Sequence, residues 1–237
     1  MKIKTRQLSL IAIFAALGAV FDSIVTPGFS AGVWFGWIFI ISTVAGMVLG
    51  PYNGFISTLI AVTIGHYLFP RETAYEFIFT LGAPIGSMIS GFMFRGDWKK
   101  VFAYYTAMLV FYFVTPISWR LPFWGMWNCY VAYIILITIA ALNKFRVINL
   151  TKIERRYLLA ICTFLGLEAD ILFRIFILVP CYGYQIFYGL TPEALALIWV
   201  APAPIITPVK VALSILATVT VYPPLIRILE KYGYSKF

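Results

Sequence analysis

Charged residues are scarce in this sequence. Asp, Glu, Lys and Arg together make up 11% of the 237 residues, whereas 62% are hydrophobic and the mean hydropathy is +0.93. A water-soluble domain of this length needs more polar surface than such a composition provides. The sequence therefore predicts an all-α polytopic transmembrane bundle, with a single integral-membrane domain over residues 1–237.

Motifs that bind metals or nucleotides are also missing. The chain has one His and three Cys, with no CxxC pair and no His partner at metal-ligand spacing. It has no P-loop and no HExxH, so it cannot hydrolyse ATP itself. We expect no metal, no cofactor and no enzymatic activity. The net charge of +9 comes from basic residues between apolar runs and not from a basic stripe, which argues against nucleic acid as a partner.

Residues 34–70 are the clearest membrane element that is present. Two apolar runs, Trp34–Leu49 and Phe55–Phe69, are separated only by the uncharged segment GPYNG at 50–54. A backbone inside hydrocarbon must satisfy its own hydrogen bonds, so each run is expected to be a helix. Proline and glycine between the runs predict a tight turn and a membrane hairpin.

Apolar runs elsewhere extend this hairpin to eight expected spans. A second glycine and proline cluster, Gly82–Gly86, predicts a kink in the fourth span. The expected spans are about 7 to 26, 34 to 50, 53 to 69, 75 to 94, 100 to 118, 122 to 142, 156 to 179 and 204 to 229.

The basic residues give these spans an orientation. With both termini in the cytoplasm, fourteen of the 18 Lys and Arg residues lie on the cytoplasmic side, and only Arg71 and Arg120 lie outside. Arg174 and Lys210 fall within spans. Such an asymmetry is typical of the positive-inside rule, and it favours a multi-pass protein of the plasma membrane. The fourteen are Lys2, Lys4, Arg6, Arg95, Lys99, Lys100, Lys144, Arg146, Lys152, Arg155, Arg156, Arg227, Lys231 and Lys236.

Five ionisable residues lie in the outer half of the expected spans or at its edge: Asp22, His66, Glu76, Arg174 and Lys210. Ionisable groups in hydrocarbon cost several kcal/mol unless they pair or face a water-filled cavity. Their common side leads to the hypothesis of an externally open polar pocket, in which all five are candidate substrate-binding residues.

A structural role for these residues is the alternative. Asp170 and Arg174 have the i,i+4 spacing of an ion pair within one helix. A single histidine such as His66 is more often a hydrogen-bonded structural residue than a ligand-binding one.

Aromatic residues gather on the same expected side. Trp34 and Trp37 begin the second span, and three more Trp residues lie near the loop that follows the fifth. Trp and Tyr populate membrane interfaces generally, which accounts for most of them. Trp34 is a candidate to stack on a ring-bearing ligand, because an aromatic wall supplies rigid contact area.

Small residues are spaced regularly on the first span. Ala12 with Ala16, and Ala15 with Ala19, are small-xxx-small pairs. Such pairs allow another helix to approach closely, either from a partner protein or from within the same bundle.

Three stretches of the chain resemble one family. RQLSLIAIFAALGAV, AGMVLGPYNGFISTLIAVTIGHYLFP and FIFTLGAPIGSMISGFMF, together with the closing PVKVALSILATVTVYPPLIRILEK, resemble substrate-binding S components of energy-coupling factor transporters. The resemblance covers about residues 7–95 and 203–231, and the GPxxG segment is its most specific part.

The resemblance implies a helical bundle that captures a vitamin or related micronutrient near the outer surface. It further implies that a first helix rich in alanine, here Ala12, Ala15, Ala16 and Ala19, docks onto a transmembrane coupling protein. Two cytoplasmic ATPases would drive the transport cycle.

The chain departs from that family in its number of spans. S components usually have six helices, so the expected pair at about 100–142 reads as an added helical hairpin. Two alternatives stay open: a self-sufficient secondary transporter, or an integral-membrane enzyme that uses Asp22, His66 and Glu76.

Overall fold

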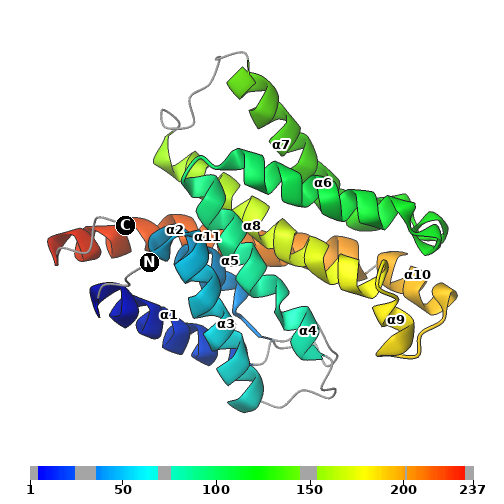
Figure 1. The fold of residues 1–237 in the computed structure, drawn as a ribbon, viewed down its shortest axis with the longest axis horizontal. Helices are drawn as coiled ribbons and strands as arrows, with labels where there is room; N and C mark the ends of the chain where they lie inside the picture. The colour runs from blue at the N-terminus through cyan, green and yellow to red at the C-terminus, as the bar shows by residue number, and fades with distance from the viewer. Residues whose placement is uncertain (1–4, 25–35, 69–75, 145–153, 201, 233–237) are drawn as a thin grey trace.

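The structure, a computed structural model, describes residues 5–24, 36–68, 76–144, 154–200 and 202–232 (Figure 1). These ranges consist of helices and connections and contain no strand, which confirms the all-α prediction.

The helices follow one another with short connections. The longer ones are α1 (Thr5–Ser23), α2 (Phe39–Leu49), α3 (Pro51–Leu68), α5 (Gly82–Phe94), α6 (Trp98–Val114), α7 (Trp127–Lys144), α8 (Arg155–Leu178), α10 (Pro192–Val200) and α11 (Pro202–Lys231). The short ones are α4 (Glu76–Thr80), α9 (Gly183–Ile186) and the 3-10 helices η2 (Pro116–Arg120) and η3 (Phe123–Met126).

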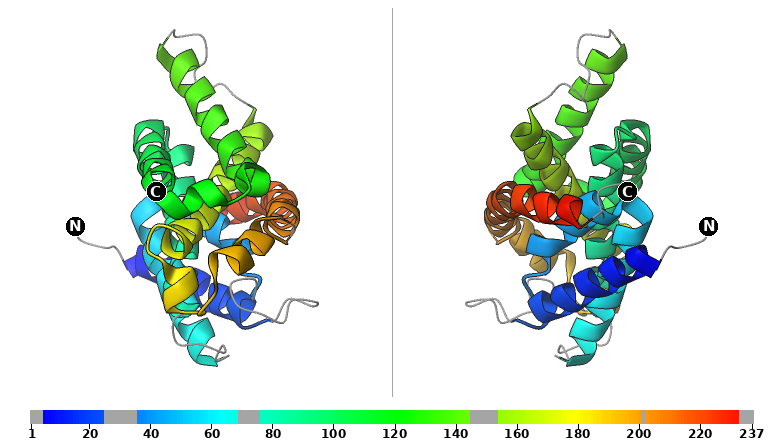
Figure 2. Two further views of the ribbon diagram at one scale, coloured as in Figure 1. Left: turned by 90° about the vertical axis from the view of Figure 1, so that its right-hand side faces the viewer. Right: turned by 90° about the vertical axis from the view of Figure 1, so that its left-hand side faces the viewer.

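The long helices other than α10 run in alternating directions through the bundle (Figure 1). α1 and α3 are parallel to each other, because Ser57 donates a hydrogen bond to Ile11 O, and Gly65 further along α3 lies against Asp22 further along α1. α2, which lies between them in the sequence, runs in the opposite direction. The bundle therefore has two ends, which Figure 2 shows in turn, with α9 and α10 toward the viewer in the left-hand view.

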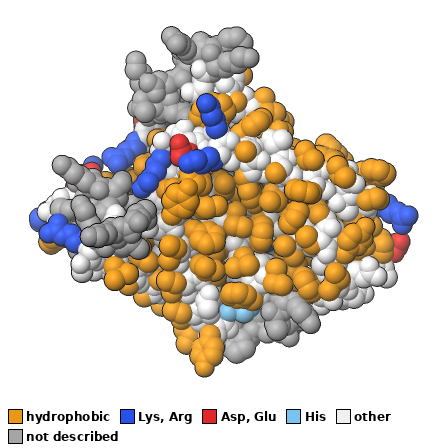
Figure 3. Space-filling view, in the orientation of Figure 1, with side chains coloured by type: hydrophobic (Ala, Val, Ile, Leu, Met, Phe, Trp, Pro, Cys, Tyr) orange, Lys and Arg blue, Asp and Glu red, His pale blue; other side chains and the backbone are white. Residues whose placement is uncertain are grey.

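One end of the bundle carries most of the described basic residues (Figure 3). There Lys100 Nζ lies 4.6 Å from the centre of the Phe92 ring, and Arg155 lies 5.7 Å from that of Tyr222. Lys100 also donates a 3.0 Å hydrogen bond to Asp97. We call this end, where α1 and α6 begin and α5 and α11 finish, the basic end.

Hydrophobic side chains cover the surface between the two ends (Figure 3). On the outer helices the exposed large apolar residues recur every three or four positions, which places them on one outward face. They include Ile13, Leu17 and Val20 on α1, and Ile56, Ile60 and Ile64 on α3. Stripes of this kind suit contact with lipid chains better than contact with water.

Four helical segments are long and apolar enough to cross a membrane by length and composition. They are Thr5–Ser23 (α1), Phe77–Phe94 (α4 and α5 together), Phe123–Asn143 (η3 and α7 together) and Ala203–Lys231 (α11). This finding within the described ranges is compatible with a multi-pass membrane protein. The expectation of eight spans is not confirmed. α2 has only 11 residues, about 16 Å of helix, and the second half of α8 carries Glu168, Asp170 and Arg174.

The expected hairpin is present as α2 and α3, but its turn is shorter than predicted. α2 ends at Leu49, Gly50 has a φ of 85°, and α3 begins at Pro51. Proline suits the first helical position because its missing N–H would have had no partner there. The predicted turn residues 51–54 are therefore helical, and Gly50 alone reverses the chain.

The predicted kink lies one residue earlier than expected. α4 ends at Thr80 and α5 starts at Gly82, so the helix is interrupted at Leu81. Gly82–Gly86 itself lies within the first turns of α5.

Small residues bring four helices into backbone contact, and we call them the small-residue seam: Gly46 of α2, Gly54 of α3, Gly86 and Ser87 of α5, and Gly166 of α8. A Cβ on Gly54 would lie 2.6 Å from Gly46 Cα, and one on Gly166 would lie 2.8 Å from Gly86 O. Such distances leave no room for a side chain, so α2 and α5 pack at the centre of the bundle.

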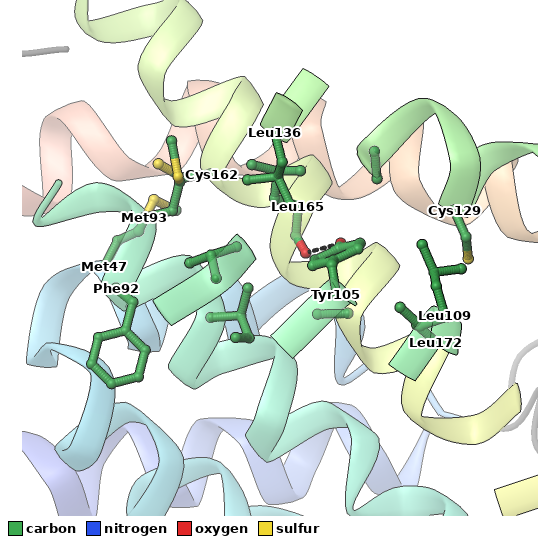
Figure 4. Packing of buried hydrophobic residues seen from close by; sticks show 14 of the residues in the cluster. Met47, Phe92, Met93, Tyr105, Leu109, Cys129, Leu136, Cys162, Leu165 and Leu172 are labelled. Atoms are coloured by element: carbon green, nitrogen blue, oxygen red, sulfur yellow. Dashed lines mark hydrogen bonds between the residues drawn. The ribbon is translucent and has the colours of Figure 1, made fainter. Parts of the chain in front are cut away.

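A larger apolar cluster fills the space beside this seam (Figure 4). Met47 and Phe92 come from α2 and α5, while Tyr105 comes from α6 and Leu165 from α8. Tyr105 is fully buried, and its hydroxyl donates a 2.7 Å hydrogen bond to Leu165 O, drawn as a dashed line in Figure 4. This cluster joins the α6 and α7 hairpin, which matches the expected pair at about 100–142, to the remaining helices.

Candidate functional site

Asp22 and His66 lie at the same contact between α1 and α3, at the end of the bundle opposite the basic end. Asp22 is 1% exposed, and a Cβ on Gly65 would lie 2.5 Å from Asp22 Oδ2. The absence of a side chain at Gly65 therefore lets the carboxylate approach α3. His66 is the next residue, half-buried, with its ring edge-on to Phe77 at 5.8 Å between centroids.

Arg174 forms a two-point ion pair with Asp170 within α8. Arg174 Nε lies 2.5 Å from Asp170 Oδ1, and Arg174 Nη2 lies 3.1 Å from Oδ2. The structure thus shows the i,i+4 ion pair that the spacing favoured as an alternative role. The Arg174 side chain is 19% exposed and that of Asp170 is 8% exposed. Asp170 Oδ1 also lies against Gly82, the first residue of α5.

Lys210 lies against the start of α2. Its Nζ is 5.1 Å from the centre of the Phe39 ring, and Trp37 stacks on that ring at 5.7 Å and 24°. Ser214, one turn further along α11, donates a 2.7 Å hydrogen bond to Phe39 O. This bond holds α11 in place and keeps Lys210 over the aromatic pair.

The other two candidate substrate-binding side chains, those of Trp34 and Glu76, lie outside the described part of the structure. Trp34 lies outside the described residues. Glu76 opens α4, and its side chain also lies outside the described part of the structure.

The four alanines of α1 divide between two faces of that helix. Ala15 and Ala19 are each 4% exposed, on the face that also holds Asp22 and packs on α3. Ala12 and Ala16 are exposed on the other face. One pair therefore packs inside the chain, and the other is available at the surface.

The structure therefore places Asp22 against Gly65, the residue before His66, and records Arg174 and Lys210 in contacts of their own. These contacts lie at the ends of α1, α3 and α8 and at the starts of α5 and α11. All are at the end of the bundle opposite the basic end. A small apolar cluster, which includes Ile38, the residue before α2, and Ala83 of α5, lies at the same end.

Glu168 is a buried acid that was not among the predicted site residues. It is 0% exposed, and its Oε2 accepts hydrogen bonds from Asn128 Nδ2 at 2.7 Å and from Cys129 Sγ at 3.4 Å. Its Oε1 has no hydrogen-bond partner among the described residues. The sequence alone could have drawn attention to Glu168, because a carboxyl group is unusual within an apolar run such as LGLEADILF. Its hydrogen-bond partners could not be predicted, because they lie on α7, about 40 residues earlier in the chain.

The energetic cost of this burial depends on the charge of the group. An unsatisfied polar atom costs about 1–3 kcal/mol, whereas an uncompensated charge in the interior costs several kcal/mol. The neutral acid is thus the form that the described surroundings of Glu168 favour, since both donors that it meets are uncharged.

Two further sequence features bear on metal binding and on hydrolase chemistry. No group of three His, Cys, Asp or Glu residues that could hold a metal ion occurs among the described residues. Residues 28–32 read GFSAG, which matches the GxSxG pattern of serine hydrolases, but they lie outside the described residues. That pattern carries catalysis at a turn from strand to helix, and the ranges on either side of it contain helices and no strand.

Comparisons with known proteins do not identify the chain. No family model, curated protein or solved structure matches it. The resemblance to energy-coupling factor S components therefore stays a prediction, and the function is inferred from the contacts described above.

Proposed function

We propose that the chain is the membrane-embedded substrate-capture subunit of an ATP-driven importer of the energy-coupling factor type, specific for a vitamin or related micronutrient. One observation carries the proposal. Asp22, His66, Arg174 and Lys210 come from four different helices and lie at the end of the bundle away from the basic end. Costly polar groups collected at one end of an apolar bundle are typical of a ligand-binding surface.

The proposal includes a membrane topology. α2, α3, α6 and α8 would cross the bilayer together with the four helices that meet the length and hydropathy criteria, making eight spans around a core of six. α6 and α7 would be the added pair. By the positive-inside rule the basic end faces the cytoplasm, with both termini there, and the polar end opens outside the plasma membrane.

Each polar contact has a role in this proposal. Asp22, which lies against Gly65, and His66, the next residue of α3, would hydrogen-bond the polar edge of the ligand. Glu76 would join them, because it precedes Phe77, whose ring the His66 ring contacts. Arg174 and Lys210 would attract an anionic group, and Trp34 would stack on a ring. Because Asp170 already binds Arg174 at two points, an anionic ligand would have to share or replace that carboxylate.

Ligand binding should raise the melting temperature of the purified protein. A ligand at 100 times its Kd adds about 2.7 kcal/mol to stability, or about 5–10 °C for a chain of this size. A panel of water-soluble vitamins tested by thermal unfolding in detergent would reveal it. The K210A variant should lose the shift for an anionic ligand, whereas K99A, an exposed lysine at the basic end, should keep it. Failure of every vitamin to shift the wild-type protein would contradict the proposal.

The partners in this proposal are a transmembrane coupling protein and two cytoplasmic ATPases. The exposed alanines Ala12 and Ala16 would form the docking face, while Ala15 and Ala19 hold α1 flat against α3. Small side chains suit a face that must bind and release another helix, because they let two backbones approach without interlocking.

Enlarging the docking face should break the complex without unfolding the subunit. A12L and A16L place leucine on an exposed face, so the melting temperature should change by less than about 2 °C while co-purification with the coupling protein is lost. A212L, an exposed alanine on α11, is the matched control and should keep the partner. Retention of the partner by A12L and A16L would show that this face is not the docking site.

A secondary transporter is the competing function. Uptake by this chain alone in proteoliposomes, driven by an ion gradient and without ATPases, would favour it.

A further inference from the structure

Glu168 occupies a position that the proposed substrate site does not use. It lies in the middle of α8 and faces α7, where Asn128 and Cys129 both donate hydrogen bonds to the same oxygen, Oε2. Glu168 and Cys129 are 0% exposed, and Asn128 is 3% exposed. The contact joins the α6 and α7 hairpin to α8.

The described residues around Glu168 provide hydrogen bonds but no positive charge. From α6, the hydroxyls of Tyr104 and Tyr105 are committed to Ala169 O and Leu165 O. On α8 itself, the nearest cation, Arg174, is paired with Asp170 one turn away.

The remaining elements add no cation at this contact. On α11, Lys210 lies over the Phe39 ring of α2. Within the described ranges, none of the ion pairs that the structure records involves Glu168.

We propose that Glu168 is a proton-binding site in the interior of the bundle. The two oxygens have different roles. Oε2 is the carbonyl oxygen of the neutral acid and accepts both hydrogen bonds. Oε1, which has no partner among the described residues, is the hydroxyl oxygen and carries the proton. The ligand of this site is a proton, because the neutral acid matches two uncharged donors in a place without a counter-ion.

This assignment gives the contact between α7 and α8 a chemical requirement. With the proton bound, the acid is a neutral hydrogen-bond acceptor that joins the two helices. If the proton is removed, a negative charge remains in an apolar interior. The hairpin contact therefore depends on the charge state of one residue.

Infrared spectroscopy of the full chain in lipid vesicles tests the proposal directly. At a pH where exposed carboxylates are ionised, the wild-type protein should show the carbonyl stretching band of a protonated carboxyl group. That band should disappear in E168Q and remain in E193Q, a control at an exposed acid of α10. Identical bands in the wild-type protein and E168Q would overturn the assignment.

Thermal stability supplies a second test. It distinguishes a protonated Glu168 from an ionised Glu168 that binds a cation. Glutamine keeps the shape, the neutral charge and the acceptor oxygen, so E168Q should melt within about 2 °C of the wild-type protein. E168A removes the acceptor and leaves a void, and its melting temperature should fall by about 5 °C or more. If E168Q melts as low as E168A, or does not fold, the site needs a negative charge and the proposal is wrong.

Discussion

Replacing Gly46 with alanine should lower the stability of the bundle more than any other single methyl group added to it. Gly46 lies on α2 where its backbone touches α5, and a Cβ there would meet the carbonyl oxygen of Ser87 at well under 3.0 Å and the hydroxyl of Ser90 at 2.5 Å. The backbone carbonyl cannot rotate away as a flexible side chain would. The two helices must therefore move apart.

The expected effect combines two opposing terms. Alanine gains about 1 kcal/mol over glycine in a helix interior. Overpacking costs about 1–3 kcal/mol and more where only backbone can move. Because the seam also holds α3 and α8 through Gly54 and Gly166, we expect a net loss of about 3 kcal/mol and a melting temperature lower by about 10 °C. Thermal unfolding of the purified protein in detergent measures it.

A glycine in open space provides the control. Gly96 has a φ of 82° and nothing within 4 Å of the position of a Cβ, so G96A adds conformational strain without a clash. Such strain costs about 1–2 kcal/mol. Equal losses in G46A and G96A would show that close helix contact at Gly46 contributes nothing special.

Replacing Asp170 with alanine is the second change with a large expected effect. It removes a carboxylate that is 8% exposed, binds Arg174 at two points and lies against the start of α5. Removing one partner of a buried ion pair costs about 3–5 kcal/mol, because the other charge loses the carboxylate that faces it. We expect D170A to unfold about 10 °C below the wild-type protein.

The chain contains a matched pair for comparison. Asp97 and Lys100 also form an ion pair at 3.0 Å within one helical turn, but their side chains are 48% and 55% exposed. Exposed pairs contribute at most about 1 kcal/mol, so D97A should change the melting temperature little. A double-mutant cycle on Asp170 and Arg174 should give a coupling of about 2 kcal/mol, and a coupling near zero would contradict the role of the pair.

Helix positions were predictable where apolar runs are long and uninterrupted. The first span was expected at about 7–26 and α1 covers Thr5–Ser23, while the seventh was expected at about 156–179 and α8 covers Arg155–Leu178. Breakers were predictable as well, since glycine and proline restrict the backbone locally. Their detailed effect was not: Gly50 alone makes the turn that five residues were expected to share.

Contacts between distant residues set the limit of the prediction for the site. The pair of Asp170 and Arg174 could be expected from spacing within one helix. The approach of Asp22 to Gly65 depends on how α1 and α3 pack. The hydrogen bond from Asn128 to Glu168 joins two residues that are 40 positions apart in the chain and lie on different helices. No local pattern specifies such pairs, because many side chains compete for each position on a helix surface.

The small-residue seam has a mechanical consequence. Where Gly46, Gly54, Gly86 and Gly166 touch, main chain rests on main chain, and there are no long side chains to change rotamer and absorb a displacement. α2, α3, α5 and α8 should therefore respond to force as one stiff unit. A shape change that follows ligand capture would then occur as rotation of the outer helices about this unit, with little deformation inside it.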